Sequence, residues 1–437
     1  MAKSAPVRWL EESDASNSSN NNMNAVSAST MKPVSEAVVV GGGPAGSFTA
    51  WNLSKLGVET TVVEEHAEIG VPSHCAGHIS IRSLRKFGLY PLPKGIVENT
   101  FSAANFYSPN GTSFSVRLER PVTCALNREL FDKFLATKAE AAGAHYRLGS
   151  RVHSLIIDAG FAKGINIEQA SGVESVEAKV VVDAEGISAR FVKEAGLAAP
   201  RGDGLVYAVE AEVENVRNLE TDSVEVFVGK EYAPGFYGWI MPLPNETAKV
   251  GLATKTGNPK DLLQKLMFKH PVAAKLLKGS QVKQSSFHPV TLGGPIAKTY
   301  ANGFLVVGDA ASQVKPTTGG GVIFGLTCGQ LAAETASEAI KRKDISSDFL
   351  RKYQERCDEK LGFDFAVMLR IRKFLDSLSD KKINSILRVC NRLGLGKALK
   401  DVDEIDFQGK LLLEMLTKPS AFATFGYLLL LYLSANP

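Results

Sequence analysis

Short apolar runs that end at glycines open the ordered part of the chain. Ala37–Val40 is a continuous apolar run, typical of a strand buried on both faces of a parallel sheet, and Gly41–Gly43 follows it directly. The next segment predicts a helix over Pro44–Leu56. A second apolar strand, Thr60–Val63, then ends at Glu64, so the chain begins as a strand–helix–strand unit.

The same strand type returns twice, and a different pattern lies between. Val180–Val182 and Phe304–Val307 are again apolar runs, and each leads into a turn that contains glycine. From Gly204 to Thr254 apolar and polar residues alternate, as in an antiparallel sheet with one covered face. We therefore expect an α/β protein with a Rossmann-type parallel-sheet domain, an antiparallel-sheet substrate domain and a helical C-terminal region.

These changes of pattern set the expected domain boundaries. Residues 1–35 hold too few apolar residues to form a core and are predicted to be a disordered polar tail. Residues 36–200 and 285–345 are assigned to one discontinuous cofactor-binding domain. Residues 201–284 form the antiparallel-sheet substrate domain, and residues 346–437 form the helical C-terminal region.

Composition narrows the class of protein without naming a chemistry. A hydrophobic content of 44% and a charged content of 22% are ordinary for a soluble globular protein. The net charge of +4 is small for 437 residues and gives no argument for nucleic acid as a partner. Five scattered cysteines without a CxxC pair fit neither a disulfide framework nor the usual zinc or iron–sulfur spacings. We expect no metal and a cytoplasmic location.

No run approaches the roughly 18 apolar residues of a transmembrane helix. The nearest, Ala421–Leu433, contains Thr424, Gly426 and two tyrosines. Two interpretations stay open for this segment: an interfacial helix that dips into lipid, or a terminal helix packed on the core. The first would place the protein peripherally on the cytoplasmic membrane face.

The first glycine turn has the spacing of a dinucleotide-binding motif. In Gly41-x-Gly43-x-x-Gly46, the first glycine permits the tight turn, the second lets the backbone approach a pyrophosphate, and the third lets helix and strand pack closely. Ala45 lies inside this turn, and the phosphates are expected at the helix N-terminus. Glu64, at the end of the second strand, is placed to accept hydrogen bonds from ribose hydroxyls. The alternative is that the glycines serve turn geometry alone.

Two later strand ends indicate which dinucleotide is bound. One aspartate follows the strand at 180–182, and another follows the strand at 304–307 in a Gly-Asp pair before a triple glycine. Such an aspartate can accept from the ribityl hydroxyls of FAD, and a glycine-rich helix start can present N–H groups to the flavin. For the second aspartate a helix cap is the alternative. The expected cofactor contacts here are Asp183, Gly186, Gly308, Asp309, Gly320 and Gly321.

The order of these motifs resembles the two-domain FAD-binding class that includes the aromatic hydroxylases. Arg128 fits that class as the arginine that opens the helix after the first insertion, where its counterpart lies near the pyrophosphate. A solvated arginine at a helix start is the alternative interpretation. The resemblance implies a flavoprotein that binds FAD.

Two further segments, residues 71–77 just after the second strand and residues 237–251, resemble the geranylgeranyl reductases. Tyr237-Gly238-Trp239-Ile240-Met241-Pro242, followed by eight residues and Gly251, is similar to that family's YxWxFPx(7–8)GxG motif, with Met241 and Ala253 as departures. The resemblance covers about residues 37–334. Archaeal members saturate the isoprenoid chains of digeranylgeranylglycerophospholipids, and plant and bacterial members act on the geranylgeranyl tail of chlorophyll.

The resemblance implies roles for a few side chains. Cys75 would lie near the flavin and relay a proton or shape the pocket; a small buried hydrophobe is the alternative. His74 is better explained as an exposed loop histidine. Tyr237 and Trp239, two apart on a strand, point to one face and are expected to line an apolar tunnel for the isoprenoid chain, although aromatic residues in an alternating strand are often simply core.

The remaining expectations concern partners and competing functions. No second GxGxxG motif follows a strand, so we expect no dedicated NAD(P)H domain, and the electrons must come from an external donor, either NAD(P)H or ferredoxin. An FAD-dependent monooxygenase acting on an apolar substrate would share the cofactor motifs. A non-catalytic prenyl-group escort protein would keep the fold but would not need the flavin. The preferred hypothesis is a reductase of isolated C=C bonds in archaeal membrane lipids.

Overall fold

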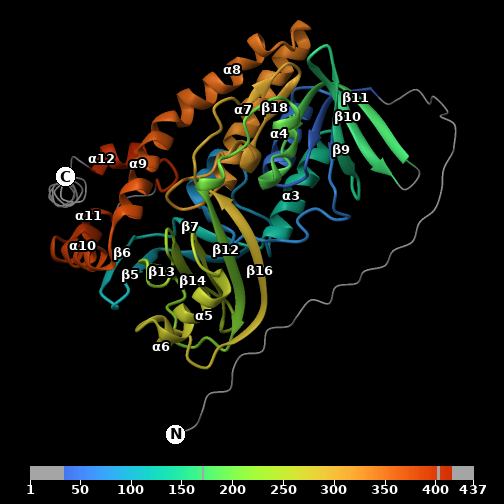
Figure 1. Cartoon of the computed structure of the whole chain (residues 1–437). Helices are drawn as coiled ribbons and strands as arrows, with labels where there is room; N and C mark the ends of the chain where they lie inside the picture. The colour runs from blue at the N-terminus through green and yellow to red at the C-terminus, as the bar shows by residue number, and fades with distance from the viewer. Residues whose placement is uncertain (1–33, 170–171, 401–403, 416–437) are drawn as a thin grey trace.

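The computed structural model describes residues 34–169, 172–400 and 404–415. They form two lobes, each built around a sheet, with helices of the last quarter of the chain along one side (Figure 1).

The first lobe is built on an eight-stranded sheet with a parallel centre. Its main order is β17-β18-β11-β1-β2-β8, and β10 and β9 extend it antiparallel from β11. Strands β18, β11, β1, β2 and β8 are neighbours in this order, and all four pairs are parallel. Parallel pairing is expected for apolar runs buried on both faces. The bounds are β1 Val34–Val40, β2 Thr60–Val63, β8 His145–Arg147, β9 Arg151–Asp158, β10 Phe161–Gln169, β11 Gly172–Asp183, β17 Tyr300–Ala301 and β18 Phe304–Val306.

Three helices cover one face of this sheet: α1 (Pro44–Lys55), α3 (Arg128–Ala141) and α7 (Val322–Arg342). Helix α7 packs closely against α1 at two of its glycines, Gly325 and Gly329. A Cβ at Gly329 would lie only 2.5 Å from Thr49 Oγ1. The main core therefore fills the space between the parallel sheet and these helices.

The second lobe is a seven-stranded sheet of order β16-β12-β15-β14-β13-β5-β6. All its neighbours are antiparallel except β13 and β5. Helices α5 (Pro259–Lys269) and α6 (Ala273–Leu276) cover one face, which leaves the other face toward the first lobe. The bounds are β5 Ala103–Tyr107, β6 Ser113–Arg117, β12 Leu205–Glu214, β13 Ser223–Val228, β14 Tyr237–Leu243, β15 Thr247–Thr254 and β16 Gln281–Thr291.

Smaller elements connect and flank the lobes. A three-stranded sheet, β3-β7-β4, lies between them. The bounds are β3 His78–Ser80, α2 Ile81–Lys86, β4 Val97–Phe101, β7 Thr123–Leu126, α4 Arg190–Glu194, α8 Ser347–Cys357, α9 Phe363–Ser377, α10 Asp380–Arg392, α11 Leu395–Ala398 and α12 Gln408–Met415.

The predicted fold class is confirmed, and two boundaries are sharper in the structure. Strand β1 already includes Val34 and Ser35, and Ser35 is buried, with Oγ donating to Ala37 O at 3.0 Å. The antiparallel sheet also recruits β5 and β6, which the predicted boundaries place with the first lobe. The domain division as a whole stays a prediction. Most of the expected polar tail and the apolar run 421–433 lie outside the described residues.

Candidate active site

The carboxyl ends of β1, β11 and β18 bring the three glycine turns together. A Cβ at Gly41 would lie 2.4 Å from Ala184 O in the turn after β11. A Cβ at Gly308, after β18, would lie 3.0 Å from the Cβ of Ala45. Motifs more than 260 residues apart therefore meet at one edge of the parallel sheet, where ligands of α/β folds bind.

The first turn has the geometry that a pyrophosphate needs. Gly41 has φ +100°, which favours glycine, and a Cβ at Gly46 would lie 1.9 Å from Gly41 O. A Cβ at Gly43, by contrast, would meet nothing within 4 Å. No side chain caps the N-terminus of α1, whose N-cap is Gly43. The open space and the uncapped amides fit an anionic group.

Glu64 is held at the end of β2 by the neighbouring backbone. Its Oε2 accepts from Gly42 N at 2.7 Å, and its Oε1 accepts from His66 N at 3.0 Å. His66 Nδ1 also lies 2.6 Å from Oε1. These contacts fix the carboxylate beside the glycine turn, and its contact with a ribose stays a prediction.

Asp183 and Gly186 lie in the turn after β11. The Asp183 carboxylate is fully buried, and Oδ1 accepts from Glu185 N at 3.0 Å, whereas Oδ2 has no partner among the described residues. Burial, and then the charge of Glu185, raise the pKa of Asp183. Gly186 has φ +77° and open space where a Cβ would be. Its exposed turn fits a ligand better than the enclosed carboxylate does.

Asp309 presents a carboxylate that the surrounding protein leaves free. Its side chain is partly exposed and makes no hydrogen bond to the residues that the structure describes. Burial raises the pKa of Asp309, and the charge of Arg128 opposes that shift. No side chain caps the short helical turn that contains it or helix α7, so Asp309 is not a helix cap. A free acceptor of this kind fits a ligand rich in hydroxyls.

The triple glycine lies at the start of α7, as predicted. Gly321 is the N-cap, and a Cβ there would come within 2.9 Å of Asp309 Oδ1. A Cβ at Gly320 would lie 2.6 Å from Lys315 Cε. The loop thus packs tightly against both neighbours while its helix N-terminus remains uncapped.

Arg128 connects this edge with the predicted catalytic loop. It opens α3, and its side chain is only 10% exposed, so it is not a solvated surface arginine. Its Nε and Nη2 donate to the two Asp132 oxygens at 3.1 and 3.0 Å. Burial works against the charge, but Asp132 and the sulfur of Cys75 more than offset it, so the pKa of Arg128 is raised.

Cys75 is exposed, which excludes the alternative of a buried hydrophobe. Gly77 N donates to its Sγ at 3.5 Å, and Arg128 contacts it. The neighbouring His74 is exposed as expected, and its ring stacks on His288 of β16 with centroids 5.7 Å apart. The loop of residues 71–77 therefore reaches from the cofactor edge to the antiparallel sheet.

Tyr237 and Trp239 share one face of β14, as predicted, with ring centroids 5.9 Å apart. Tyr237 Oη donates to Thr318 O at 2.7 Å, just before the triple glycine. A Cβ at Gly251 would lie 2.4 Å from Trp239 Cζ2, so only glycine leaves room for the indole. Trp239 Nε1 then donates to Glu210 Oε2 at 3.0 Å.

Sequence reasoning missed the buried charged groups around these residues. Glu210 looked like an ordinary polar position in an alternating strand. Lys249 of β15 is 8% exposed and pairs with Glu98 at 2.6 Å. No sequence signal marks either partner, because strands distant in the chain bring them together.

A second missed pair supports the triple-glycine loop. Lys315 Nζ and Asp406 Oδ1 are 2.6 Å apart and nearly buried, and Ser83 Oγ donates to Asp406 Oδ2 at 2.5 Å. Burial alone would raise the pKa of Asp406, but Lys315 and the hydrogen bonds lower it. The partners are 91 residues apart in the chain, so local patterns could not predict the contact.

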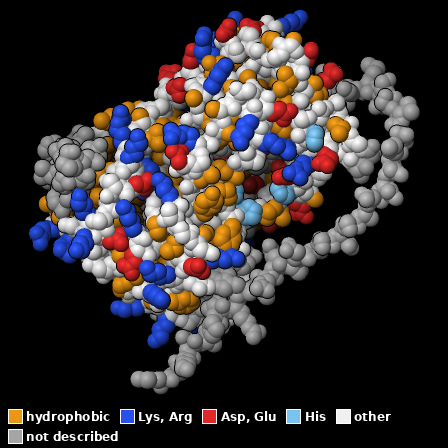
Figure 2. All heavy atoms as spheres, in the orientation of Figure 1, with side chains coloured by type: hydrophobic (Ala, Val, Ile, Leu, Met, Phe, Trp, Pro, Cys, Tyr) orange, Lys and Arg blue, Asp and Glu red, His pale blue; other side chains and the backbone are white. Residues whose placement is uncertain are grey.

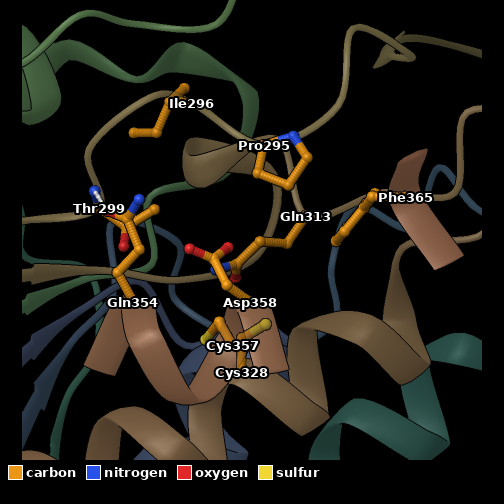
Figure 3. Close-up of a pocket in the computed structure, with 9 residues that line it drawn as sticks. All are labelled: Pro295, Ile296, Thr299, Gln313, Cys328, Gln354, Cys357, Asp358 and Phe365. Carbon is orange, nitrogen blue, oxygen red and sulfur yellow. Dashed lines mark hydrogen bonds between the residues drawn. The ribbon is translucent and has the colours of Figure 1, made fainter. Parts of the chain in front are cut away.

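A small pocket behind the Gly308 turn belongs to neither predicted site (Figure 3). Within it, burial and then the adjacent thiol of Cys357 raise the pKa of Cys328. Gln313 accepts from Gly308 N and donates to Tyr353 Oη, both at 2.8 Å. These two hydrogen bonds of Gln313 hold the Gly308 turn in place from the side of the pocket. Its lining residues are Pro295, Ile296, Thr299, Gln313, Cys328, Gln354, Cys357, Asp358 and Phe365.

The glycine loop before α7 and the loop of residues 71–77 meet β14 and β16 at the junction between the lobes, which we call the recess. Figure 2 shows histidine side chains beside an apolar patch at the middle of this face. Two apolar clusters lie along the inner face of the antiparallel sheet, and the first also includes Phe101 of β4 and Ala125 of β7. They comprise Phe101, Ala125, Val224, Met241 and Leu243, and Val206, Phe236, Ala253 and Leu292. Among the described residues, no group of three or more His, Cys, Asp or Glu is arranged to hold a metal.

Comparisons with known proteins agree with this geometry. The family described as FAD binding domain matches residues 34–355, and the chain is a flavoprotein of that class. Digeranylgeranylglycerophospholipid reductase 2 of Methanopyrus kandleri is 34% identical over 383 residues, covering 86% of this chain and 96% of the relative. The corresponding reductase of Methanocaldococcus jannaschii is 33% identical and covers 91% and 99%. The chain belongs to the digeranylgeranylglycerophospholipid reductase family.

Solved structures give the same fold. A geranylgeranyl bacteriochlorophyll reductase-like protein from Thermoplasma acidophilum superposes with a TM-score of 0.81 at 26% identity, covering 91% of this chain and all of that one. The flavin-dependent brominase Bmp2 superposes at 0.67 with 20% identity, over 87% of this chain and 98% of that one. The brominase shares the fold alone.

Proposed function

We propose that this protein is an FAD-dependent reductase that saturates isolated C=C bonds of geranylgeranyl chains in archaeal membrane glycerophospholipids. The single observation that carries the proposal is the match to the archaeal reductases over nearly their whole length. The Trp239–Gly251 contact supports it, because it accounts for the spacing of the family motif. No observation favours a monooxygenase or an escort protein.

The residues around the recess divide into two groups. We infer that Gly43, Ala45 and the start of α1 hold the pyrophosphate, and that Asp309 accepts from hydroxyls of the FAD. Reduced FAD supplies the hydride for alkene reduction. Arg128, itself paired with Asp132, keeps a positive charge beside this site. The remaining expected contacts, Gly41, Gly46, Glu64, Cys75, Asp183, Gly186, Gly308, Gly320 and Gly321, shape the same edge.

The substrate side requires an apolar channel and no carbonyl-polarising group, because an isolated alkene has no carbonyl. Tyr237 and Trp239 supply two aromatic walls, and the buried apolar clusters of the inner sheet face pack behind them. Such a surface holds successive double bonds in line and excludes water.

The electron donor and the membrane contact are proposals of their own. An external donor, either NAD(P)H or ferredoxin, would reduce the FAD. A lipid substrate makes peripheral membrane contact reasonable, and among the described residues no helix is long and apolar enough to cross a membrane. Deleting residues 419–437 and measuring liposome binding tests the contact; unchanged binding of the folded deletion argues against it.

A direct test uses the purified holoenzyme. Reduced anaerobically with dithionite, it is mixed with digeranylgeranylglycerophospholipids, and mass spectrometry follows the gain of hydrogen pairs. Saturated chains are the expected product. An intact lipid beside flavin that stays reduced would overturn the proposal, and a hydroxylated lipid formed when oxygen is admitted would establish the monooxygenase instead.

A further inference from the structure

Alkene saturation needs a proton donor as well as a hydride. Few side chains around the recess can supply a proton. Tyr237 already donates to Thr318 O, and burial raises its pKa, so it holds its proton tightly. Burial lowers the pKa of both His74 and His288, which leaves their rings neutral near pH 7. Asp309 is assigned to the hydroxyls of FAD, so Cys75 and Glu210 remain as candidates.

Glu210 lies in the same row of the sheet as the motif aromatics. On β12 it pairs with Gly251 of β15, which pairs in turn with Trp239 of β14. Because Gly251 has no side chain, the Trp239 indole crosses β15 and donates to Glu210 Oε2 at 3.0 Å. Oε1 has no hydrogen-bond partner among the described residues, and the side chain is partly exposed on the face toward the recess. The family motif therefore orients one carboxyl oxygen and leaves the other free.

The environment of Glu210 favours the protonated form of its carboxyl group. Removal from water raises the pKa of Glu210 to about 7, in spite of Lys249 of β15 and the indole N–H of Trp239. Glu212 of β12 and Glu98 of β4 raise it further. Lys249 is paired with Glu98, and the residue opposite Glu210 on β16 is the uncharged Ser286. An acid with this pKa suits proton transfer near neutral pH.

We propose that Glu210 is the proton donor of alkene reduction, an inference that rests on the proposed reductase function. As the hydride adds to one alkene carbon, the Glu210 O–H bond breaks and a C–H bond forms at the neighbouring carbon. The product is a saturated bond and a carboxylate, which regains a proton from water.

The first test is single turnover of dithionite-reduced holoenzyme with the prenyl lipid. Glu210→Gln keeps the shape and the contact with Trp239 but cannot donate, so we expect the rate to fall about 100-fold or more. Glu214→Gln, at the end of the same strand, is the matched control and should stay near the wild-type rate. The wild-type rate should decline as the pH rises through about 7, because only protonated Glu210 donates.

The second test does not depend on turnover. Protonation of Glu210 removes a charge from the acceptor of the Trp239 N–H, so the tryptophan emission of the holoenzyme should titrate with a midpoint near pH 7. Glu210→Gln should abolish that transition. In Trp239→Phe the pH at which turnover declines should rise, because the indole N–H stabilises the carboxylate.

The outcomes separate this inference from the proposed function. Wild-type rates in Glu210→Gln overturn the inference, and a large loss in Cys75→Ser instead would assign the proton to Cys75. If Glu210→Gln does not retain FAD, Trp239→Phe provides the test instead, and an unshifted pH profile in that variant overturns the inference. If the wild type reduces no prenyl lipid while the emission titrates as expected, the proposed function is wrong, and only the raised pKa of Glu210 is supported.

Discussion

The parallel-sheet lobe and the antiparallel-sheet lobe form their halves of the recess in different ways. In the first lobe, glycines at strand ends bring backbone close to backbone, as at Gly46 and Gly41. In the second, a glycine makes room for a side chain, as Gly251 does for Trp239. One half depends on main-chain geometry within a single turn, and the other on side chains that meet across three strands.

This difference separates two kinds of mutational effect. Changes in the glycine turns should act on folding and on FAD retention, because the backbone there cannot yield. Changes on the antiparallel face should spare the flavin and act on the lipid. Four substitutions test this difference, in order of decreasing expected effect.

Gly46→Ala should have the largest effect. The added Cβ would lie 1.9 Å from Gly41 O, a backbone atom that cannot move without opening the turn between β1 and α1. We expect no folded, yellow protein, measured as flavin absorbance after purification and as thermal melting. A stable variant that retains FAD would show that the turn is looser than its geometry indicates.

Asp406→Asn should destabilise the loop before α7 by about 3–5 kcal/mol, because Lys315 would lose its buried partner. The folded-state pKa of Asp406 is lowered, so its stabilisation is complete above the usual carboxyl range and is lost as the pH falls through the folded pKa. Denaturant unfolding at pH 7 and at acid pH measures both effects. Asn should remove part of the acid sensitivity, and an unchanged unfolding free energy at pH 7 would contradict the prediction.

Gly43→Ala should leave folding intact and weaken FAD binding by about 10- to 100-fold, or roughly 1.4–2.7 kcal/mol. Its Cβ meets nothing in the protein and would occupy the space proposed for the pyrophosphate. Gly202→Ala is the matched control, because a Cβ there also meets nothing. Titration of both apoproteins with FAD provides the comparison; equal affinities would remove Gly43 from the cofactor site.

Gly251→Ala should retain FAD and slow lipid reduction by about 10-fold, since displaced groups at a site of chemistry cost turnover. Its Cβ would lie 2.4 Å from Trp239 Cζ2 and push the indole away from Glu210. Ala253→Gly, on the same face of β15, restores the glycine of the family motif and should keep turnover. Loss of FAD in Gly251→Ala would contradict the idea that the antiparallel face acts on the lipid and not on the flavin.

Much of the first lobe could be predicted from the sequence because its signals are local. The turn at 41–46 and the start of α7 after Gly321 need only a few consecutive residues to be recognised. Cys75 could be named as a candidate, but its exposure could not, since that depends on where residues 71–77 lie against Arg128. The recruitment of β5 and β6 into the second sheet was likewise hidden.

The cofactor class, the order of the glycine turns and the fold class could be predicted from the sequence alone, because glycine spacing and strand periodicity act over short stretches of chain. Which charges lie beside the inner face of the antiparallel sheet depends on the tertiary structure. Glu210, Lys249 and Glu98 come from three strands, and Lys315 meets Asp406 from another part of the chain. Their pairing depends on register and burial, which no local pattern records.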